Sequence, residues 1–248
     1  MKKLSLLLAL LALFVRQASA FETAQGIVST AITAVPFTVT APGNYYLATD
    51  LTFTAAAGAA ISINADQVIL DLNGHTLKAT VPGLAIGIFV NIHKDVTVQN
   101  GDVDGFGFIG VLLQGTATGT NAKNTVRNVK LNDDEVGVQT AYGQSNEIEF
   151  CSIDGGDIGI LSVNDKGGTR FFHNNLAGQK KGSLFGLGLP LLSGGSLTGT
   201  LSEDNVITKG DFPFGEVRST GDRLRFDSGL GFSGALFSGG TDLTNVSK

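Results

Sequence analysis

The chain has 248 residues, of which 22 are acidic and 17 basic, so that the net charge is −5 and the pI is near 5.1. This balance argues against nucleic acid or an anionic membrane surface as a partner, because both require a basic face. The single cysteine excludes an internal disulfide, so packing and backbone hydrogen bonds must stabilise the fold.

The first twenty residues have the pattern of a secretory signal peptide. Lys2 and Lys3 precede an apolar run from Leu4 to Val15, and Ala18-Ser19-Ala20 supplies the small residues of a cleavage site. The run is about twelve residues long, against the roughly twenty needed to span a bilayer. We therefore expect cleavage after Ala20, export to the periplasm, cell surface or extracellular space, and no membrane span in the mature protein.

Residues 21–60 are predicted to form a leader and short cap strands. Phe37 to Val39, Tyr45 to Leu47 and Leu51 to Phe53 are short apolar segments around the Pro42-Gly43 turn. A stack of strands needs such a cap, because its first coil would otherwise present unpaired strand edges to water.

The stretch from Val68 to Leu77, VILDLNGHTL, predicts a strand, a tight turn and a second short strand. Five residues separate Leu72 from Leu77, and similar apolar five-residue steps recur every 22 to 30 residues, at Val98/Val103, Val126/Leu131, Ile148/Ile153, Phe171/Leu176 and Leu201/Val206. A period of this length is typical of a solenoid, in which each coil buries its apolar face only against its neighbours.

A second ladder is in phase with the first. Small-to-apolar steps recur at Gly87-Ile88, Gly110-Val111, Gly137-Val138 and Gly159-Ile160. Together the two ladders predict an all-β fold, a single-stranded right-handed parallel β-helix of about seven or eight coils over residues 61–235, followed by a tail over residues 236–248.

Stacking also predicts neighbours among the polar residues. Arg127 is expected over Glu149, Glu147 against Arg170, and Asp102 against Lys130, as ordinary ladder pairs. The tight turn is expected at one column of residues, because Gly and Asn in it tolerate a left-handed bend, with Asn100 and Asn128 stacked in its lining. The column contains Gly74, Asn100, Asn128, Phe150, His173 and Glu203.

Once the coils are aligned in this way, the start of the repeat resembles a known signature. The ISIN strand followed by VILDLNGHTL is similar to the first coil of secreted bacterial β-helix proteins of the pectin-lyase-like superfamily. The resemblance covers about Phe37 to Val206. It implies the fold but leaves the chemistry open, since the superfamily includes lyases, hydrolases, epimerases, adhesins and tailspikes.

The resemblance suggests two enzymatic alternatives. A pectate-lyase-like site would bind calcium through acidic residues, and Asp133, Asp134 and Glu135 form the densest acidic group. The favoured interpretation of this group is a solvated turn. A polygalacturonase-like site has partial matches in Asp102-Val103-Asp104-Gly105, Asp133-Asp134 and Gly155-Gly156-Asp157, whereas its His is absent and Lys180-Lys181 lacks its Arg. Asp104 with Asp133 or Asp134 would then supply the acid and base of inverting hydrolysis.

The remaining reactive residues offer no complete site. His75 is expected to bond to backbone in the Asn73-Gly74 turn, and the three His residues do not share a coil face, which argues against a zinc site. Cys151 has no His near it in sequence and is interpreted as a buried, inert thiol.

Two functions therefore remain. The favoured one is a secreted or cell-surface protein with a structural, adhesive or glycan-binding role, without a cofactor, whose partner is a polysaccharide or cell-envelope glycan. The alternative is a polysaccharide hydrolase or lyase using Asp104, Asp133 and Asp134, with calcium if it is lyase-like. The short turns between Val126 and Gly178 favour the first, because polysaccharide-cleaving β-helices usually have long loops that wall a cleft.

Overall fold

The computed structural model describes residues 28–116, 122–163 and 168–177 in full, and six later strands by their backbone alone. This part of the chain is all-β. The expected signal peptide, residues 1–20, and most of the expected tail, residues 236–248, lie outside the described residues. Among the described residues, no helix is long and apolar enough to cross a membrane.

The strands form two parallel sheets. Sheet A, of 16 strands, contains β1 (Ser29–Ile32), β3 (Gly43–Leu47), β4 (Leu51–Phe53), β6 (Val68–Asp71), β7 (Thr76–Ala79), β9 (Thr97–Asp104), β11 (Thr125–Asn132), β13 (Glu147–Glu149), β14 (Ser152–Asp154), β16 (Arg170–Phe172), β17 (Asn175–Ala177), β19 (Thr200–Glu203), β20 (Val206–Ile207), β21 (Glu216–Thr220), β22 (Arg223–Leu224) and β23 (Leu236–Phe237). Sheet B, of seven strands, contains β2 (Phe37–Val39), β5 (Ala57–Ile63), β8 (Leu84–Asn91), β10 (Ile109–Gln114), β12 (Val136–Ala141), β15 (Ile158–Val163) and β18 (Gly182–Leu187).

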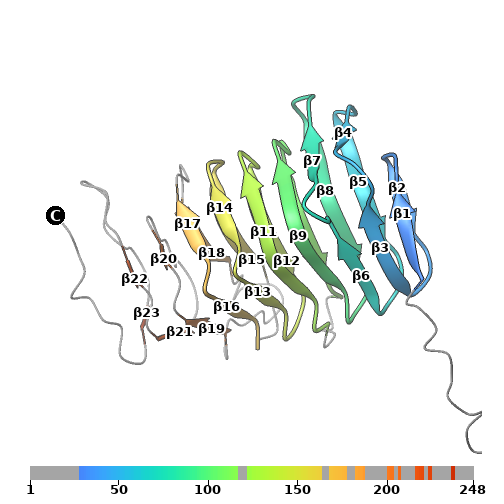
Figure 1. Cartoon of the computed structure of the whole chain (residues 1–248). Coiled ribbons are helices and arrows are strands. Elements are labelled where there is room, and N and C mark those ends of the chain that lie inside the picture. The colour runs from blue at the N-terminus through green and yellow to red at the C-terminus, as the bar shows by residue number, and fades with distance from the viewer. Residues whose placement is uncertain are drawn as a thin grey trace, which may run out of the picture.

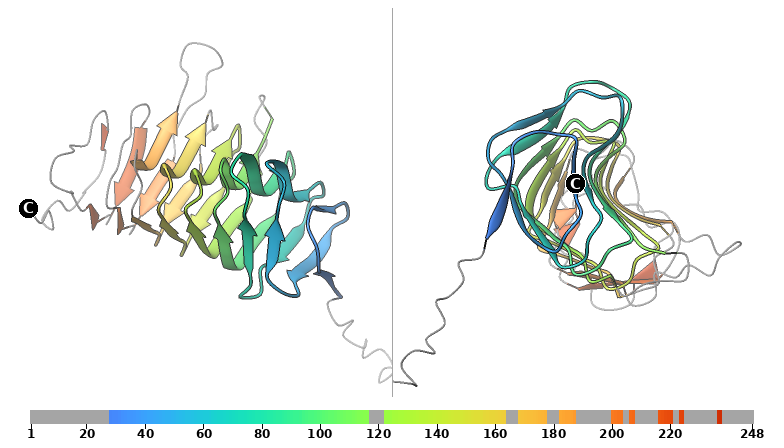
Figure 2. Two further views of the ribbon diagram at one scale, coloured as in Figure 1. Left: turned by 90° about the horizontal axis from the view of Figure 1, so that it is seen from above. Right: turned by 90° about the vertical axis from the view of Figure 1, so that its right-hand side faces the viewer.

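The chain alternates between the sheets and returns to each one coil further on. Sheet A follows the path β1-β3-β6-β9-β11-β13-β16-β19-β21-β23, and sheet B follows β2-β5-β8-β10-β12-β15-β18 (Figure 1). A view along the stack shows the coils superposed around a common interior (right panel of Figure 2). The predicted β-solenoid is therefore confirmed, with about five turns in the well-described part.

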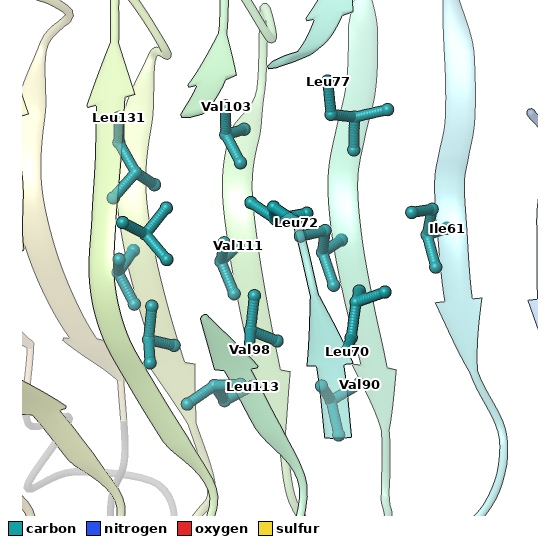
Figure 3. Packing of buried hydrophobic residues seen from close by; sticks show 14 of the residues in the cluster. Ile61, Leu70, Leu72, Leu77, Val90, Val98, Val103, Val111, Leu113 and Leu131 are labelled. Carbon is teal, nitrogen blue, oxygen red and sulfur yellow. The ribbon is translucent and has the colours of Figure 1, made fainter. Parts of the chain in front are cut away.

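The aliphatic column that the five-residue steps predict forms the interior. Val98, Val126, Ile148 and Phe171 occupy one register position of sheet A, and their side chains are at most 2% exposed. The second apolar residues of the five-residue steps form a similar column. Successive register partners in it are Leu77, Val103, Leu131 and Ile153, and all four are buried. Figure 3 shows several of these side chains pointing into the space between the sheets.

The first coil departs from the predicted phase. Leu70, and not Leu72, is the register partner of Val98, so β6 and β7 are separated by two residues more than the predicted step allows. Leu72 is nevertheless fully buried. Its Cβ lies only 2.4 Å from where a Cβ on Gly101 would stand, so Leu72 fills space that the glycine of the next coil leaves open.

The second ladder is confirmed in sheet B. Ile88, Val111, Val138 and Ile160 are successive register partners and all four are buried. The preceding glycines pass close to one another, since a Cβ on Gly110 would stand 2.7 Å from the carbonyl oxygen of Gly137. Glycine is therefore required here by the approach of backbone from the next coil.

The register shifts by one residue after β16. Phe171 pairs with Ser202, and Leu176 pairs with Ile207, whereas the five-residue steps placed Leu201 and Val206 at these positions. Between β17 and β19 the chain passes through β18 of sheet B, which pairs in parallel with β15.

Candidate functional site

In the coils whose side chains are described, from β1 to β17, the outward side chains of sheet A form a largely polar surface, which we call the polar face. Strand alternation places them outward, because their sequence neighbours, such as Val98 and Val103 in β9, are buried. The charged residues of the polar face comprise four basic side chains, Lys78, Arg127, Lys130 and Arg170, and six acidic ones, Asp71, Asp102, Asp104, Glu147, Glu149 and Asp154.

A hydrogen-bond network links the coils along the polar face. Gln99 donates from Nε2 to Asp71 Oδ2 over 2.8 Å. Its Oε1 accepts from Nε and Nη2 of Arg127, over 2.9 and 2.6 Å. Arg127 and Glu149 are register partners, as the stacking predicts, but the described contacts of the guanidinium are made to Gln99 of the preceding coil.

The other two charge pairs are observed. Arg170 Nη1 lies 3.6 Å from Glu147 Oε1, and Lys130 Nζ lies 4.0 Å from Asp102 Oδ1. A further pair, one residue after the register partners Leu77 and Val103, joins Lys78 Nζ to Asp104 Oδ2, at 2.5 Å. Each cation of the polar face is therefore engaged by a neighbouring coil.

The predicted left-handed column lies at the corner of the polar face. Asn100, Asn128, Phe150 and His173 have φ angles of 59°, 51°, 53° and 55°. The expected asparagine stack is present, since Asn128 Nδ2 donates to Asn100 Oδ1 over 2.9 Å. One coil further, the rings of Phe150 and His173 stack, with centroids 4.9 Å apart and planes inclined by 14°.

Two open hollows lie on this surface. The first, of about 280 Å³, is lined by Gly74, Asn100, Gly101, Asp102, Asn128 and Lys130. The second, of about 460 Å³, is lined by Lys123, Thr125, Ser145, Glu147, Gly168 and Arg170. Both are bordered mainly by hydrogen-bonding groups, which suit a polar ligand lying along the coils.

The structure brings the three predicted catalytic carboxylates to one edge of neighbouring coils. Asp104 ends β9, and Asp133 and Asp134 follow the end of β11, whose Asn132 is the register partner of Asp104. Asp104 is bound to Lys78. Asp133 is exposed and has a left-handed φ of 53°.

Asp134 differs from its neighbours because it is buried, with 3% of its surface exposed. Its Oδ1 accepts a hydrogen bond from Phe106 N–H over 2.8 Å, whereas its Oδ2 is buried without a hydrogen-bond partner in the protein. Burial above all, followed by the charges of Asp104 and Asp133, raises the pKa of Asp134 well above its ordinary value.

The interpretation of this acidic group as a solvated turn is therefore wrong for Asp134, which fixes the preceding coil. A sequence signal for this burial exists in Gly110, where a Cβ would stand 2.4 Å from Asp134 Oδ2. The side chain thus occupies space that the glycine leaves open. This proximity can be recognised only when the register of the two coils is known.

The histidines bind carboxylates or rings of neighbouring coils. His75 Nδ1 lies 3.1 Å from Asp50 Oδ1, which corrects the expected bond to backbone, and His93 Nδ1 lies 2.8 Å from Asp66 Oδ1. The histidine hydrogen bond is the largest cause of the lowered pKa of Asp66, whereas for Asp50 the bond from Thr76 N–H comes first. Within the described ranges, no group of three or more His, Cys, Asp or Glu residues is placed to hold a metal ion.

Cys151 is buried as expected. Its thiol lies 3.3 Å from the carbonyl oxygen of Glu149, and burial raises its pKa to about 12. A thiol in this environment stays protonated and is not a nucleophile at neutral pH.

Comparisons with known proteins add little to this description. Neither a known protein family nor a curated protein matches the sequence. Among solved structures, an alginate lyase from a Paenibacillus species, strain FPU-7, is similar, with a TM-score of 0.42 and 11% sequence identity over 89% of this chain and 94% of that one. A likeness this distant carries no argument about activity.

Proposed function

We propose that the protein is an exported, non-catalytic binding protein that recognises a polysaccharide through the polar face of sheet A. The polar face supports this proposal most directly, because it presents amide, carboxylate and guanidinium groups at a regular spacing of about 4.8 Å from coil to coil. The network from Asp71 through Gln99 to Arg127 holds these groups in fixed positions. A preordered row of donors and acceptors loses little entropy when it binds an extended chain of hydroxyl-bearing rings.

The state of the predicted acids favours binding over cleavage. Inverting hydrolysis requires an acid and a base that both reach the scissile bond. Asp134 is buried behind the surface, and Asp104 is held by Lys78. In this arrangement Asp134 presents no oxygen atom to a polymer, and one of the two oxygen atoms of Asp104 is already bound.

One observation favours the enzymatic alternative. The raised pKa of Asp134 keeps a proton on a carboxyl group close to two other acids, as a general acid requires. This function would need Asp134 to become exposed when substrate binds. The hydrolase and lyase alternatives are therefore included in the test.

Affinity electrophoresis of the mature protein through gels containing single polysaccharides tests the proposal. We expect retardation by at least one polymer, and neither new reducing ends nor unsaturated products after long incubation with it, with or without calcium. Products that disappear in Asp104→Asn and Asp134→Asn variants would establish the enzymatic alternative instead. The absence of both retardation and products over a broad panel of polymers would overturn both functions.

A further inference from the structure

Phe150 is an exposed aromatic residue at a left-handed turn position. Its side chain is 57% exposed although it is large and apolar. Its φ of 53° lies in the left-handed region, which is unfavourable for a bulky residue. The equivalent positions of the two preceding coils hold Asn100 and Asn128, which tolerate this conformation and bond to each other. An asparagine at position 150 would therefore suit the fold better than phenylalanine.

The aromatic ring is supported from the next coil. Phe150 stacks on His173 at 4.9 Å, and Phe172 meets Phe150 edge-on, with centroids 6.3 Å apart and planes at 80°. The three rings form a rigid cluster beside the hydrogen-bonding groups of the polar face. Three adjoining rings that are exposed or partly exposed, one of them at a strained backbone position, point to a ligand that uses their surface.

We propose that Phe150, supported by His173, is the stacking subsite for a sugar ring of a neutral polysaccharide. This inference rests on the proposed function and specifies its ligand. A pyranose ring presents an apolar face of C–H groups, which packs on an aromatic ring, while its hydroxyl groups remain at the edge. The neighbouring amides, guanidinium and carboxylates of the polar face are placed to bond those hydroxyl groups.

The charges of the polar face favour a neutral polysaccharide over an acidic one. Four cations stand against six acids on this surface. Lys78, Lys130 and Arg170 are paired with carboxylates, and Arg127 is bonded to Gln99. A uronate polymer would bring further negative charge to a surface on which these four cations are already engaged. A neutral polymer meets no such repulsion.

The variant Phe150→Asn separates binding from folding. It removes the ring but extends the asparagine stack by one coil, so we expect its thermal unfolding midpoint to equal or exceed that of the wild type. Phe108→Asn is the matched control, because Phe108 is a similarly exposed phenylalanine, at 39%, outside the ring cluster. His173→Ala tests the supporting ring.

Dissociation constants are measured by affinity electrophoresis and calorimetry with a β-glucan, a xylan and a galactomannan as neutral polymers, and with alginate and polygalacturonate as acidic ones. We expect wild type to prefer a neutral polymer. The Phe150→Asn variant is expected to bind it about three- to tenfold more weakly, the range for losing one ring contact, and Phe108→Asn is expected to bind like wild type.

Each of the other possible results contradicts a specific part of the proposal. Equal binding by wild type and Phe150→Asn removes the stacking subsite and leaves the proposed function intact. A wild-type preference for alginate or polygalacturonate removes the neutral-ligand inference alone. Binding of no polymer, neutral or acidic, overturns the inference together with the proposed function.

Discussion

Asp134 shows how far the environment of one residue can depart from what its sequence neighbours suggest. Three consecutive acids, Asp133, Asp134 and Glu135, predict a hydrated turn, yet the middle one is buried and bonded to Phe106 N–H. The residues next to Asp134 in the sequence do not indicate that it is buried. The explanation lies one coil away in sheet B, where Gly110 provides the space that the carboxyl group occupies.

The buried carboxyl group predicts an unusual pH dependence of stability. Because the pKa of Asp134 is raised in the folded state, the folded protein keeps a proton that the unfolded chain has already lost. Its contribution is therefore most favourable at low pH, and it diminishes as the pH rises above the ordinary Asp value of 3.8. The slope from one such group is at most about 1.4 kcal/mol per pH unit.

Urea unfolding of wild type and Asp134→Asn between about pH 5 and pH 8 measures this contribution. We expect the free energy of unfolding of the variant to fall less with rising pH, because asparagine retains the acceptor for Phe106 and does not ionise. The control Asp133→Asn should keep most of the wild-type slope, since burial is the first cause of the raised pKa. Parallel pH profiles for wild type and Asp134→Asn would contradict the assignment.

Cys151 provides a second prediction at the scale of one residue. The thiol is 2% exposed and its pKa is about 12, so we expect no alkylation by iodoacetamide at neutral pH in the native protein. Complete alkylation should follow on unfolding in urea, because this is the only cysteine of the chain. Mass spectrometry of the two samples checks the difference, and stoichiometric labelling of the native protein would show that this coil opens readily.

At the scale of single coils, some positions can be predicted from the sequence and others cannot. The positions of Val98, Val126 and Ile148 follow from the period alone, because a parallel stack places equivalent residues of successive coils in register. The first coil is ambiguous, since Leu70 and Leu72 alternate inward and either one fits the period. The choice depends on how many residues the turn before β7 contains, and hydrophobic pattern does not fix turn length.

The candidate site follows from the sequence in part. The Arg170–Glu147 and Lys130–Asp102 pairs are predicted by the register. The Lys78–Asp104 pair obeys the same register, one residue after Leu77 and Val103, but is missing from the predicted pairs. The exposed ring of Phe150 was placed at its turn position, but its importance depends on exposure and φ, which only the structure provides.

The ladder pairs predict a charge-reversal effect between β9 and β11. Lys130→Asp would bring a second carboxylate beside Asp102, and we expect a loss of about 0.2 to 1 kcal/mol in the free energy of unfolding, the range for exposed cross-strand pairs. The double variant Lys130→Asp/Asp102→Lys restores the opposite charges. Chemical unfolding at low and high salt checks both statements, since salt should reduce the loss. A double variant no more stable than the single one would show that the pair contributes nothing.

At the scale of the whole molecule, stacking converts isolated residues of a chain with net charge −5 into a surface on which the charges are largely paired. Coils supply opposite charges to one another, so the polar face offers directional hydrogen bonds and little attraction for an anionic polymer. This arrangement distinguishes the protein from one that captures a charged polymer by electrostatic steering, where binding weakens steeply with salt.

The last prediction concerns the salt dependence of polysaccharide binding. If recognition uses hydrogen bonds and ring stacking, the dissociation constant for a neutral polymer should change by less than about twofold between about 50 and 500 mM NaCl, because screening acts on charges and not on these contacts. Arg127→Gln should weaken binding by the same factor at both salt concentrations, since its guanidinium would act as a hydrogen-bond donor. Calorimetric titrations at the two concentrations measure both effects. A loss of affinity of tenfold or more at high salt in the wild type would mean that charged groups of the polar face, and not hydrogen bonds and ring stacking alone, determine the affinity.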